Sequence, residues 1–334
     1  MFKRRDVLVL GSGWLAGMGM IPPCAVAQSK YPERPIRLVV ASVPGGVADA
    51  VGRRWAEAMK ALLGPVFIEN QAGGGGSIGA ATVDRAKPDG YCVLLGGVAI
   101  LVLIPAASHA RWEFAPISIL GVVPIAFIVH PSLPARNLKE LVEYAKANPG
   151  ELSYGSPGAG TMSHLAVELF KSLTGINGLV HVPYKGANQS ISDLISGQIP
   201  IVTLNFSDQV LQLHRSGKAR MVAVMTPARL IAAPDIPTAV EQGLPGMMAE
   251  NFFGLFAPIG TSTEIIEQIA DATHRAMADN GFRERLIASG FEPYLDSSPA
   301  AARHFVEREI DRWRPMIKAI GLKLGMRRGS SERA

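Results

Sequence analysis

Residues 36–49 have the sequence IRLVVASVPGGVAD, which predicts a strand, a glycine-containing turn and the start of a helix. Ile36–Ser42 is almost wholly apolar, as expected of a parallel strand that is buried on both faces. The pair Gly45-Gly46 lets the backbone pass close to a ligand. A helix is predicted over Asp49–Leu63, with Gly64 as the residue that terminates it. The free N–H groups at the start of this helix favour an anion beside the turn.

The same alternation of apolar runs and helical patterns continues along the chain. Val66–Asn70 and Cys92–Gly97 complete a first unit of three buried strands. Helical segments that end near glycines separate the strands of a second unit, which are Leu152–Gly155, Leu179–Tyr184, Ile199–Phe206 and Ala219–Thr226. This pattern predicts an α/β fold in which mainly parallel sheets are flanked by helices.

Two further apolar runs predict strands that pass between the units, Val122–His130 and Asn251–Ala257. Capping-box patterns predict helix starts after both runs, at Asn137 with Glu140 and at Thr261 with Glu264. Ser298-Pro299 predicts the start of a long last helix. The uncharged stretches 91–110 and 114–135 contain glycines and prolines, so we interpret them as buried strands and turns and not as membrane spans.

Composition narrows the class of protein. The 334 residues include 33 Lys+Arg and 28 Asp+Glu, a formal charge of +5, with 48% hydrophobic and 18% charged residues. These values exclude an intrinsically disordered chain, a coiled coil and a disulfide scaffold. The surplus of positive charge is not concentrated in the body of the chain, so we expect no nucleic-acid partner.

Residues 1–27 have the features of an export signal. Lys3, Arg4 and Arg5 precede an uncharged stretch, and Ala25-Val26-Ala27 predicts cleavage after Ala27. The paired arginines fit the twin-arginine route, although such pairs also occur in ordinary secretory signals. Cleavage also removes Cys24, so Cys92 is the only cysteine of the expected mature protein and no intrachain disulfide can form. Cys92 lies in an apolar run, and we expect it to be a buried structural thiol.

A second loop between a predicted strand and a helix spans Gly155–His164. It offers backbone donors at Gly158 and Gly160 and the hydroxyls of Ser156, Thr161 and Ser163. A carboxylate held by such neutral donors needs no arginine, because a hydrogen bond to a charged group contributes about 1.5–3 kcal/mol. Capped turns without a ligand are the alternative for one loop, but a loop of this kind in each unit favours binding.

The glycine run 73–79 contains the spacing G-x-G-x-x-G of a dinucleotide loop. The next strand ends without the acidic residue that holds a ribose, so a loop lining a pocket is the preferred interpretation. Catalytic and metal-binding patterns are weak: Ser156 lacks the first glycine of a nucleophile elbow, and the histidines lack metal-ligand spacing. His164 and Lys185 are candidates for contacting an anion.

Taken together, these blocks resemble the periplasmic solute receptors of tripartite tricarboxylate transporters, the Bug family of substrate-binding proteins. The resemblance spans about residues 28–322. Its matching stretches are Tyr31–Val39, Pro44-Gly45-Gly46 with Asp49, Glu69-Asn70, Gly75–Gly79, Pro88–Tyr91, Leu152–Ser156, Ser163–Leu165, Val182–Gly186, Pro234–Thr238, Gly243–Gly246 and Phe253–Pro258.

The resemblance implies a two-lobed periplasmic-binding-protein fold of type II, with lobe 1 at 28–126 and 250–334 and lobe 2 at 127–249. It implies that two crossover strands form a hinge and that a small organic carboxylate is held between the lobes and delivered to membrane permease subunits. The expected ligand-binding residues are Val43, Gly45, Gly46, Val47, Ala48, Asp49, Gly76, Ser77, Gly97, Val98, Ser156, Gly158, Gly160, Thr161, Ser163, His164, Lys185 and Asn205.

The chain departs from the family pattern at several of these positions. Val43 stands where an aromatic residue or proline is frequent, and Val47-Ala48 stands where a small residue and then Thr or Ser is common. Gly97–Ala99 replaces a stretch that often carries Ser or Thr, and Asn205 stands where Asp is frequent. We therefore expect a more apolar pocket, which favours a monocarboxylate or aromatic carboxylate over a tricarboxylate. The missing acid at position 205 argues against a ligand that bears an ammonium group.

We therefore expect a periplasmic, monomeric binding protein that is not an enzyme and has no cofactor or metal. One alternative is an exported nucleotide-dependent oxidoreductase that uses Gly74–Gly79. The other is a sensory receptor that uses the same fold to report its ligand to a membrane partner.

Overall fold

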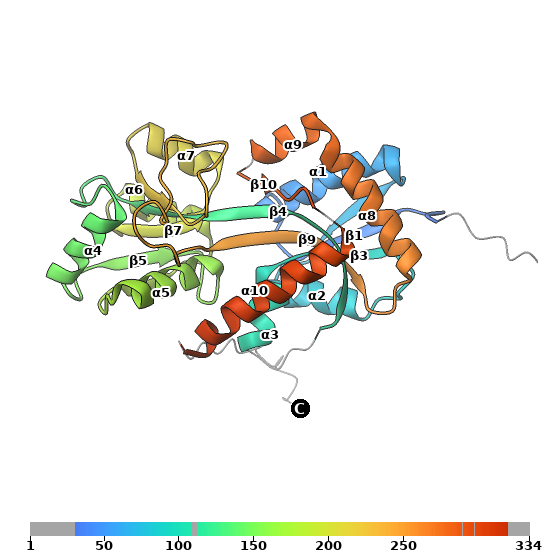
Figure 1. Ribbon diagram of the computed structural model, residues 1–334, viewed down its shortest axis with the longest axis horizontal. Helices are drawn as coiled ribbons and strands as arrows, with labels where there is room; N and C mark the ends of the chain where they lie inside the picture. The colour runs from blue at the N-terminus through green and yellow to red at the C-terminus, as the bar shows by residue number, and fades with distance from the viewer. Residues whose placement is uncertain (1–30, 108–111, 289, 297, 320–334) are drawn as a thin grey trace, which may run out of the picture.

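The computed structural model describes residues 31–107, 112–288, 290–296 and 298–319, so the predicted signal and its cleavage site lie outside the described residues. The described chain forms two α/β lobes joined by long strands (Figure 1). No helix among the described residues combines the length and apolarity needed to cross a bilayer.

Lobe 1 begins with the strand–turn–helix of residues 36–62. Strand β1 pairs in parallel with β2 on one side and β3 on the other, as predicted. Its first elements are β1 (Ile36–Val40), α1 (Val47–Leu62), β2 (Val66–Asn70), the short turn η1 (Gly74–Gly76), α2 (Ser77–Asp84) and β3 (Cys92–Gly97).

The segment after β3 corrects the sequence prediction of strands and turns. It is helical, with η2 (Ala99–Leu103) followed by α3 (Ile104–Ala107). Ile100, Val102 and Leu103 are buried in the core. A short, continuously apolar run has no periodicity that distinguishes a buried helix from a buried strand, so the pattern alone could not decide.

Strand β4 (Phe114–Val129) is longer than the predicted Val122–His130. The prolines of this stretch suggested breaks in regular structure. Pro116 instead lies beside a shift in the register of β4 against its partner β9, and a second shift follows at Ile119/Gly121. Bulges of this kind accommodate a residue that has no backbone N–H.

Lobe 2 repeats the parallel arrangement with β6–β5–β7. The predicted strands occur here with bounds shifted by one or two residues. The elements of this lobe are α4 (Leu138–Ala147), β5 (Ser153–Ser156), α5 (Met162–Thr174), β6 (Val180–Pro183), α6 (Ala187–Ile195), β7 (Ile201–Asn205), α7 (Asp208–Arg215) and β8 (Arg220–Val224).

Two crossover strands, β4 and β9 (Glu250–Pro258), run between the lobes (Figure 1). They add antiparallel ladders to the parallel part of each sheet. Strand β4 pairs with β9 up to Pro124 and with β7 from Ile125 onward, so it belongs to both sheets. The chain then returns to lobe 1 as α8 (Thr263–Ala278), α9 (Asn280–Ile287), β10 (Glu292–Pro293) and α10 (Pro299–Ala319).

The start of α8 lies one residue beyond the predicted cap. The hydroxyl of Ser262, not that of Thr261, accepts a hydrogen bond from the N–H of Ile265. Thr261 instead donates its hydroxyl to the carbonyl oxygen of Pro258. The capping chemistry was predicted correctly, but two adjacent hydroxyl residues left its position ambiguous by one residue.

Strands β1 and β3 of lobe 1 are buried, as their apolar runs predict, but β2 was wrongly predicted to be buried: it lies at the edge of the sheet, and its Phe67 is 48% exposed. Ile36, Leu38 and Val40 pack toward α1 and α8, whereas Val39 belongs to the opposite core. Between α1 and α8, the buried indole of Trp55 donates a hydrogen bond from Nε1 to Oγ1 of Thr273 at 3.0 Å. Thr273 Oγ1 in turn donates to the carbonyl oxygen of Ile269.

We expect Thr273→Val to lower the free energy of unfolding by about 1–3 kcal/mol, because it leaves the buried Trp55 N–H without its acceptor. Thr174→Val is the matched control, since Thr174 bonds the carbonyl of Phe170 in the same helical manner, and it should cost about 0.5 kcal/mol or less. Urea unfolding followed by tryptophan fluorescence measures both. Equal losses would contradict a specific role for the indole contact.

Candidate functional site

A cavity of about 760 Å³ lies between the lobes. Lobe 1 contributes one loop, residues 43–47, and lobe 2 contributes segments that follow β5, β6 and β7. These are the carboxyl ends of parallel strands, where α/β proteins commonly bind ligands. The lining from lobe 2 is Pro157, Lys185, Gly186, Ala187, Asn188, Gln189, Ile191, Leu204, Asn205, Ser207, Asp208, Gln209 and Val210.

The loop of lobe 1 is shaped by the buried carboxylate of Asp49. Its Oδ2 accepts hydrogen bonds from the N–H of Gly45 and from Arg53 Nε, both at 2.9 Å. Its Oδ1 accepts one from Asn70 Nδ2, also at 2.9 Å. Asp49 is 3% exposed and does not line the cavity. It therefore holds the loop in shape, while Gly46 and Val47, the first residue of α1, remain at the cavity wall.

Burial alone would raise the pKa of Asp49, but the hydrogen bonds from Arg53, Gly45 and Asn70 outweigh it. The net result is a pKa below the usual value of a carboxyl group. Asp49 is therefore ionised at neutral pH, which suits its role as an acceptor of three hydrogen bonds.

The polar wall of lobe 2 consists mainly of two helix starts. Helix α6 begins at Ala187 after Lys185-Gly186, and α7 begins at Asp208 after Ser207, whose hydroxyl accepts from the N–H of Val210. With α1, three helices have their N-termini at the cavity. Each N-terminus carries a partial positive charge and unpaired N–H groups, so the cavity favours an anion.

The cavity contains six residues that the sequence predicted: Val43, Gly45, Gly46, Val47, Lys185 and Asn205. Sequence reasoning missed two groups, Asn188 with Gln189 and Ser207 with Asp208 and Gln209. Both groups come shortly after predicted strands. The rule that sites form at the carboxyl ends of parallel strands would have identified them, although neither group has the paired glycines that marked the other loops.

The second predicted loop contributes only Pro157 to this cavity. Ser156 is fully buried, and its Oγ lies 2.8 Å from His181 Nε2 and 3.1 Å from the carbonyl oxygen of Gly158. Thr161 caps α5 by accepting from the N–H of His164, and the N–H of Gly160 donates to His164 Nδ1. Ligand contacts of Ser156, Gly158, Gly160, Thr161, Ser163 and His164 stay a prediction.

Ser156 and His181 have the separation of a nucleophile and its base. However, the Ser156 hydroxyl is inaccessible, and it also accepts a hydrogen bond from the N–H of Gly158. These bonds close the turn between β5 and α5. The pair therefore has a clear structural role in shaping the loop.

His181 belongs to a stack of rings beneath this loop. Its ring lies 4.2 Å from that of His164 and 4.9 Å from that of Tyr154, measured between centroids. The Tyr154 hydroxyl donates to Glu168, which also pairs with Lys171. Burial, followed by the neighbouring His164, lowers the pKa of His181 to about 4. Burial also lowers the pKa of His164.

The remaining predicted residues lie where close packing explains them. A Cβ at Gly97 would approach the carbonyl oxygen of Phe252 to 2.4 Å, and one at Gly76 would approach Ile100 to 2.9 Å. Val98 and Ala48 are buried, and Ser77 begins α2. A Cβ at Gly79 would also approach Ala41 to 2.9 Å. Packing thus accounts for Gly76 and Gly79 of the dinucleotide-like motif without a nucleotide.

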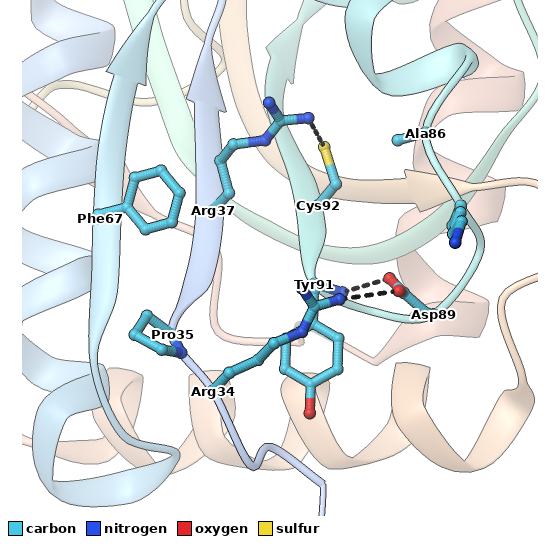
Figure 2. Close-up of a pocket in the computed structure, with 9 residues that line it drawn as sticks. Arg34, Pro35, Arg37, Phe67, Ala86, Asp89, Tyr91 and Cys92 are labelled. Atoms are coloured by element: carbon cyan, nitrogen blue, oxygen red, sulfur yellow. Dashed lines mark hydrogen bonds and ion pairs between the residues drawn. The ribbon is translucent and has the colours of Figure 1, made fainter.

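A smaller concavity of about 330 Å³ lies at the opposite end of β1, around Arg34, Arg37 and Cys92 (Figure 2). Its arginines already have partners: Arg34 pairs with Asp89 at 3.0 Å, and Arg37 pairs with Glu69 at 3.3 Å. Arg37 also donates to Cys92 Sγ at 3.2 Å. Cys92 is 6% exposed, and burial raises the pKa of its thiol, as expected of a structural cysteine.

The two-lobed α/β fold with an interlobe cavity is the fold of periplasmic solute-binding proteins. A model of the tripartite tricarboxylate transporter family receptors matches residues 51–322. A UPF0065 protein of Bordetella pertussis is 36% identical over 299 residues, which cover 88% of this chain and 91% of that protein. Protein BugT of B. pertussis is 32% identical over 318 residues, with 93% and 96% covered. The chain belongs to this receptor family.

Solved structures agree with this assignment. The periplasmic binding protein BugD has a TM-score of 0.75 at 33% identity, covering 88% of this chain and 99% of that one. MatC from Rhodopseudomonas palustris with bound malate has a TM-score of 0.74 at 28% identity, covering 86% and 100%. An R. palustris protein with adipate has a TM-score of 0.76 at 31% identity, covering 88% and 99%. These relatives are binding proteins.

We expect Asp49→Asn to lower the free energy of unfolding by about 1–3 kcal/mol at pH 7, because the Arg53 guanidinium loses its ionised partner. A lowered carboxyl pKa stabilises the fold above the unfolded value of about 3.9, and this contribution is lost as the pH falls through the folded value. The difference between wild type and variant should therefore shrink in acid. Chemical denaturation at pH 7 and pH 3.5 measures it.

The exposed Asp271 of α8 is the matched control for this substitution, and Asp271→Asn should change stability by about 0.5 kcal/mol or less. An Asp49→Asn effect that stays constant between the two pH values would contradict the role given to the ionised carboxylate.

We expect the fold to lose stability between pH 6.5 and pH 4 through His181. An unfolded histidine titrates near 6.5, whereas the folded imidazole titrates at about 4. The unfolded state therefore binds an extra proton in this window, and stability falls as the pH falls. His181→Gln should flatten this dependence in melting curves, whereas His274→Gln on the exposed face of α8 should retain it. Parallel curves for all three proteins would contradict this assignment.

Proposed function

We propose that this protein captures a small organic carboxylate between its lobes and delivers it to the permease subunits of a tripartite transporter. The observation that carries the proposal is the convergence of three helix N-termini and Lys185 on one interlobe cavity. Membership of the receptor family and the malate and adipate bound to related structures support it.

The two walls of the cavity differ in chemistry, which suggests how the ligand is oriented. The lobe 1 loop presents the side chains of Val43, Pro44 and Val47, whereas lobe 2 presents amides, a hydroxyl and Lys185 as well as Ile191, Leu204 and Val210. The polar side chains of the cavity therefore come from lobe 2, and lobe 1 adds backbone N–H groups at the start of α1. A carboxylate directed at Lys185 with an apolar body against the valines of lobe 1 suits both walls. Asp208 adds a negative charge that disfavours further carboxylates. The proposed ligand is therefore a monocarboxylate, including an aromatic one, in preference to a tricarboxylate.

Capture requires that the lobes move, and we propose that the crossover strands β4 and β9 form the hinge. The proposed lobes are 28–126 with 250–334, and 127–249. The protein acts in the periplasm after cleavage behind Ala27, as a monomer and without catalysis or a cofactor.

Isothermal titration with benzoate, adipate, malate and citrate tests this proposal. We expect binding of at least one monocarboxylate or dicarboxylate, with citrate weaker than benzoate. Lys185→Gln should weaken binding by roughly tenfold, because a charge-assisted hydrogen bond is lost. Lys218→Gln, which changes an exposed lysine outside the cavity, should not weaken it.

Absence of binding to all four acids would overturn the proposed function. Tighter binding of citrate than of benzoate would overturn only the ligand class. An unchanged affinity in Lys185→Gln would remove Lys185 from the site.

A further inference from the structure

One hydrogen bond joins the cavity to a crossover strand. Asn205 is the last residue of β7 and lines the cavity, and Asn251 is the second residue of β9. Asn251 Nδ2 donates to Asn205 Oδ1 at 2.6 Å, and the pair is partly buried. Asn251 does not line the cavity, so its contact with the site is through Asn205.

The two asparagines meet where β4 passes from one lobe to the other. Asn205 pairs with Ile125 of β4, and Asn251 pairs with Val123, two residues earlier. The backbone beside Asn205 is also fixed, because the N–H of Phe206 donates to the carbonyl oxygen of Pro124 at 2.7 Å. With the backbone held, the orientation of the Asn205 amide depends on the side-chain partner.

An asparagine amide has a carbonyl oxygen that accepts and an amino group that donates. Asn251 engages the carbonyl oxygen of Asn205, so the amino group of Asn205 remains for the cavity. A donor suits a carboxylate, whereas an ammonium group requires an acceptor. The orientation of one amide therefore decides which kind of ligand group position 205 accepts.

We propose that Asn251 is a positioning residue that turns the amino group of Asn205 toward the ligand and so selects carboxylates without an ammonium group. This inference rests on the proposed function, because it concerns the same cavity. It places a determinant of specificity on the hinge strand, outside the cavity lining.

Adipate and 2-aminoadipate are a suitable pair of probes, because they differ only by an ammonium group. We expect wild type to bind adipate more tightly. Asn205→Asp keeps the shape and the bond from Asn251 but replaces the donor with an acceptor. It should weaken adipate by roughly ten- to hundredfold and shift the ratio of the two affinities toward 2-aminoadipate.

Asn251→Asp distinguishes two roles of Asn251: control of the orientation of the Asn205 amide, and a bond that only stabilises the fold. The carboxylate that this change introduces only accepts hydrogen bonds, so it retains a bond to Asn205 only if the Asn205 amide turns over. The carbonyl oxygen of Asn205 then faces the cavity, and adipate should weaken by roughly tenfold while the melting temperature stays near that of wild type. The new carboxylate also repels adipate through its charge, so its effect is compared with that of Gln209→Glu, which adds the same charge to the cavity wall. A purely structural bond would predict equal losses of affinity in the two variants.

Two further variants complete the test. Asn251→Ala removes the partner, so it should weaken adipate by several-fold without the shift toward 2-aminoadipate that Asn205→Asp produces. Gln209→Glu adds the same charge to the cavity wall on α7 and serves as the charge control. Its effect on the affinity ratio should be smaller than that of Asn205→Asp.

The outcomes distinguish failure of the proposed function from failure of the positioning role of Asn251. If wild type binds neither 2-aminoadipate nor any of the four acids of the titration, the proposed function and this inference both fail. If it binds one of those acids but not adipate, only this inference fails. If wild type binds adipate but Asn251→Asp and Asn251→Ala bind it equally well, only the positioning role fails. If Gln209→Glu shifts the ratio as much as Asn205→Asp, charge explains the selectivity and the inference is overturned.

Discussion

The sharing of β4 between two sheets is the constraint on which the site depends. Strand β4 pairs with β9 in one lobe and with β7 in the other, and the change occurs within two residues, Pro124 and Ile125. Each sheet then adds parallel strands whose carboxyl ends face the space between the lobes. The loops after β1, β5, β6 and β7 therefore meet at one cavity, although they are far apart in the sequence.

The charge of the cavity comes mainly from the backbone. A helix N-terminus stabilises a nearby anion by about 0.3–1 kcal/mol in an exposed setting, and three of them meet here. Each dipole contributes little, so such a site binds a carboxylate reversibly, which suits the proposed delivery of the ligand to a permease. The Asp49 carboxylate interacts within lobe 1 and not with the cavity, because its oxygens accept hydrogen bonds from Gly45, Arg53 and Asn70.

The sequence was informative wherever a local rule decides the structure. Hydrophobic runs predicted the strands, and the paired glycines at 45–46 identified the lobe 1 loop. Residues 99–107 were mispredicted because a continuously apolar sequence has no period that distinguishes a helix from a strand. Asn188 and Gln209 were missed because their importance depends on the neighbouring strands that place them at the cleft. The burial of Ser156 depends on His181, a contact across 25 residues that no local pattern encodes.

The links between lobes outside β4 and β9 must be weak if the cleft is to open and close. One described link is the hydrogen bond from the N–H of Ile231 in lobe 2 to Glu292 in lobe 1, at 3.2 Å and exposed to solvent. An exposed bond of this kind contributes about 1 kcal/mol or less, because water competes for both groups. The Asn205–Asn251 bond differs, since it is partly buried and involves β9, one of the two strands of the proposed hinge. A contact near the proposed hinge would change length little if the lobes rotated, so the amide of Asn205 would keep one orientation whether the proposed cleft is open or closed.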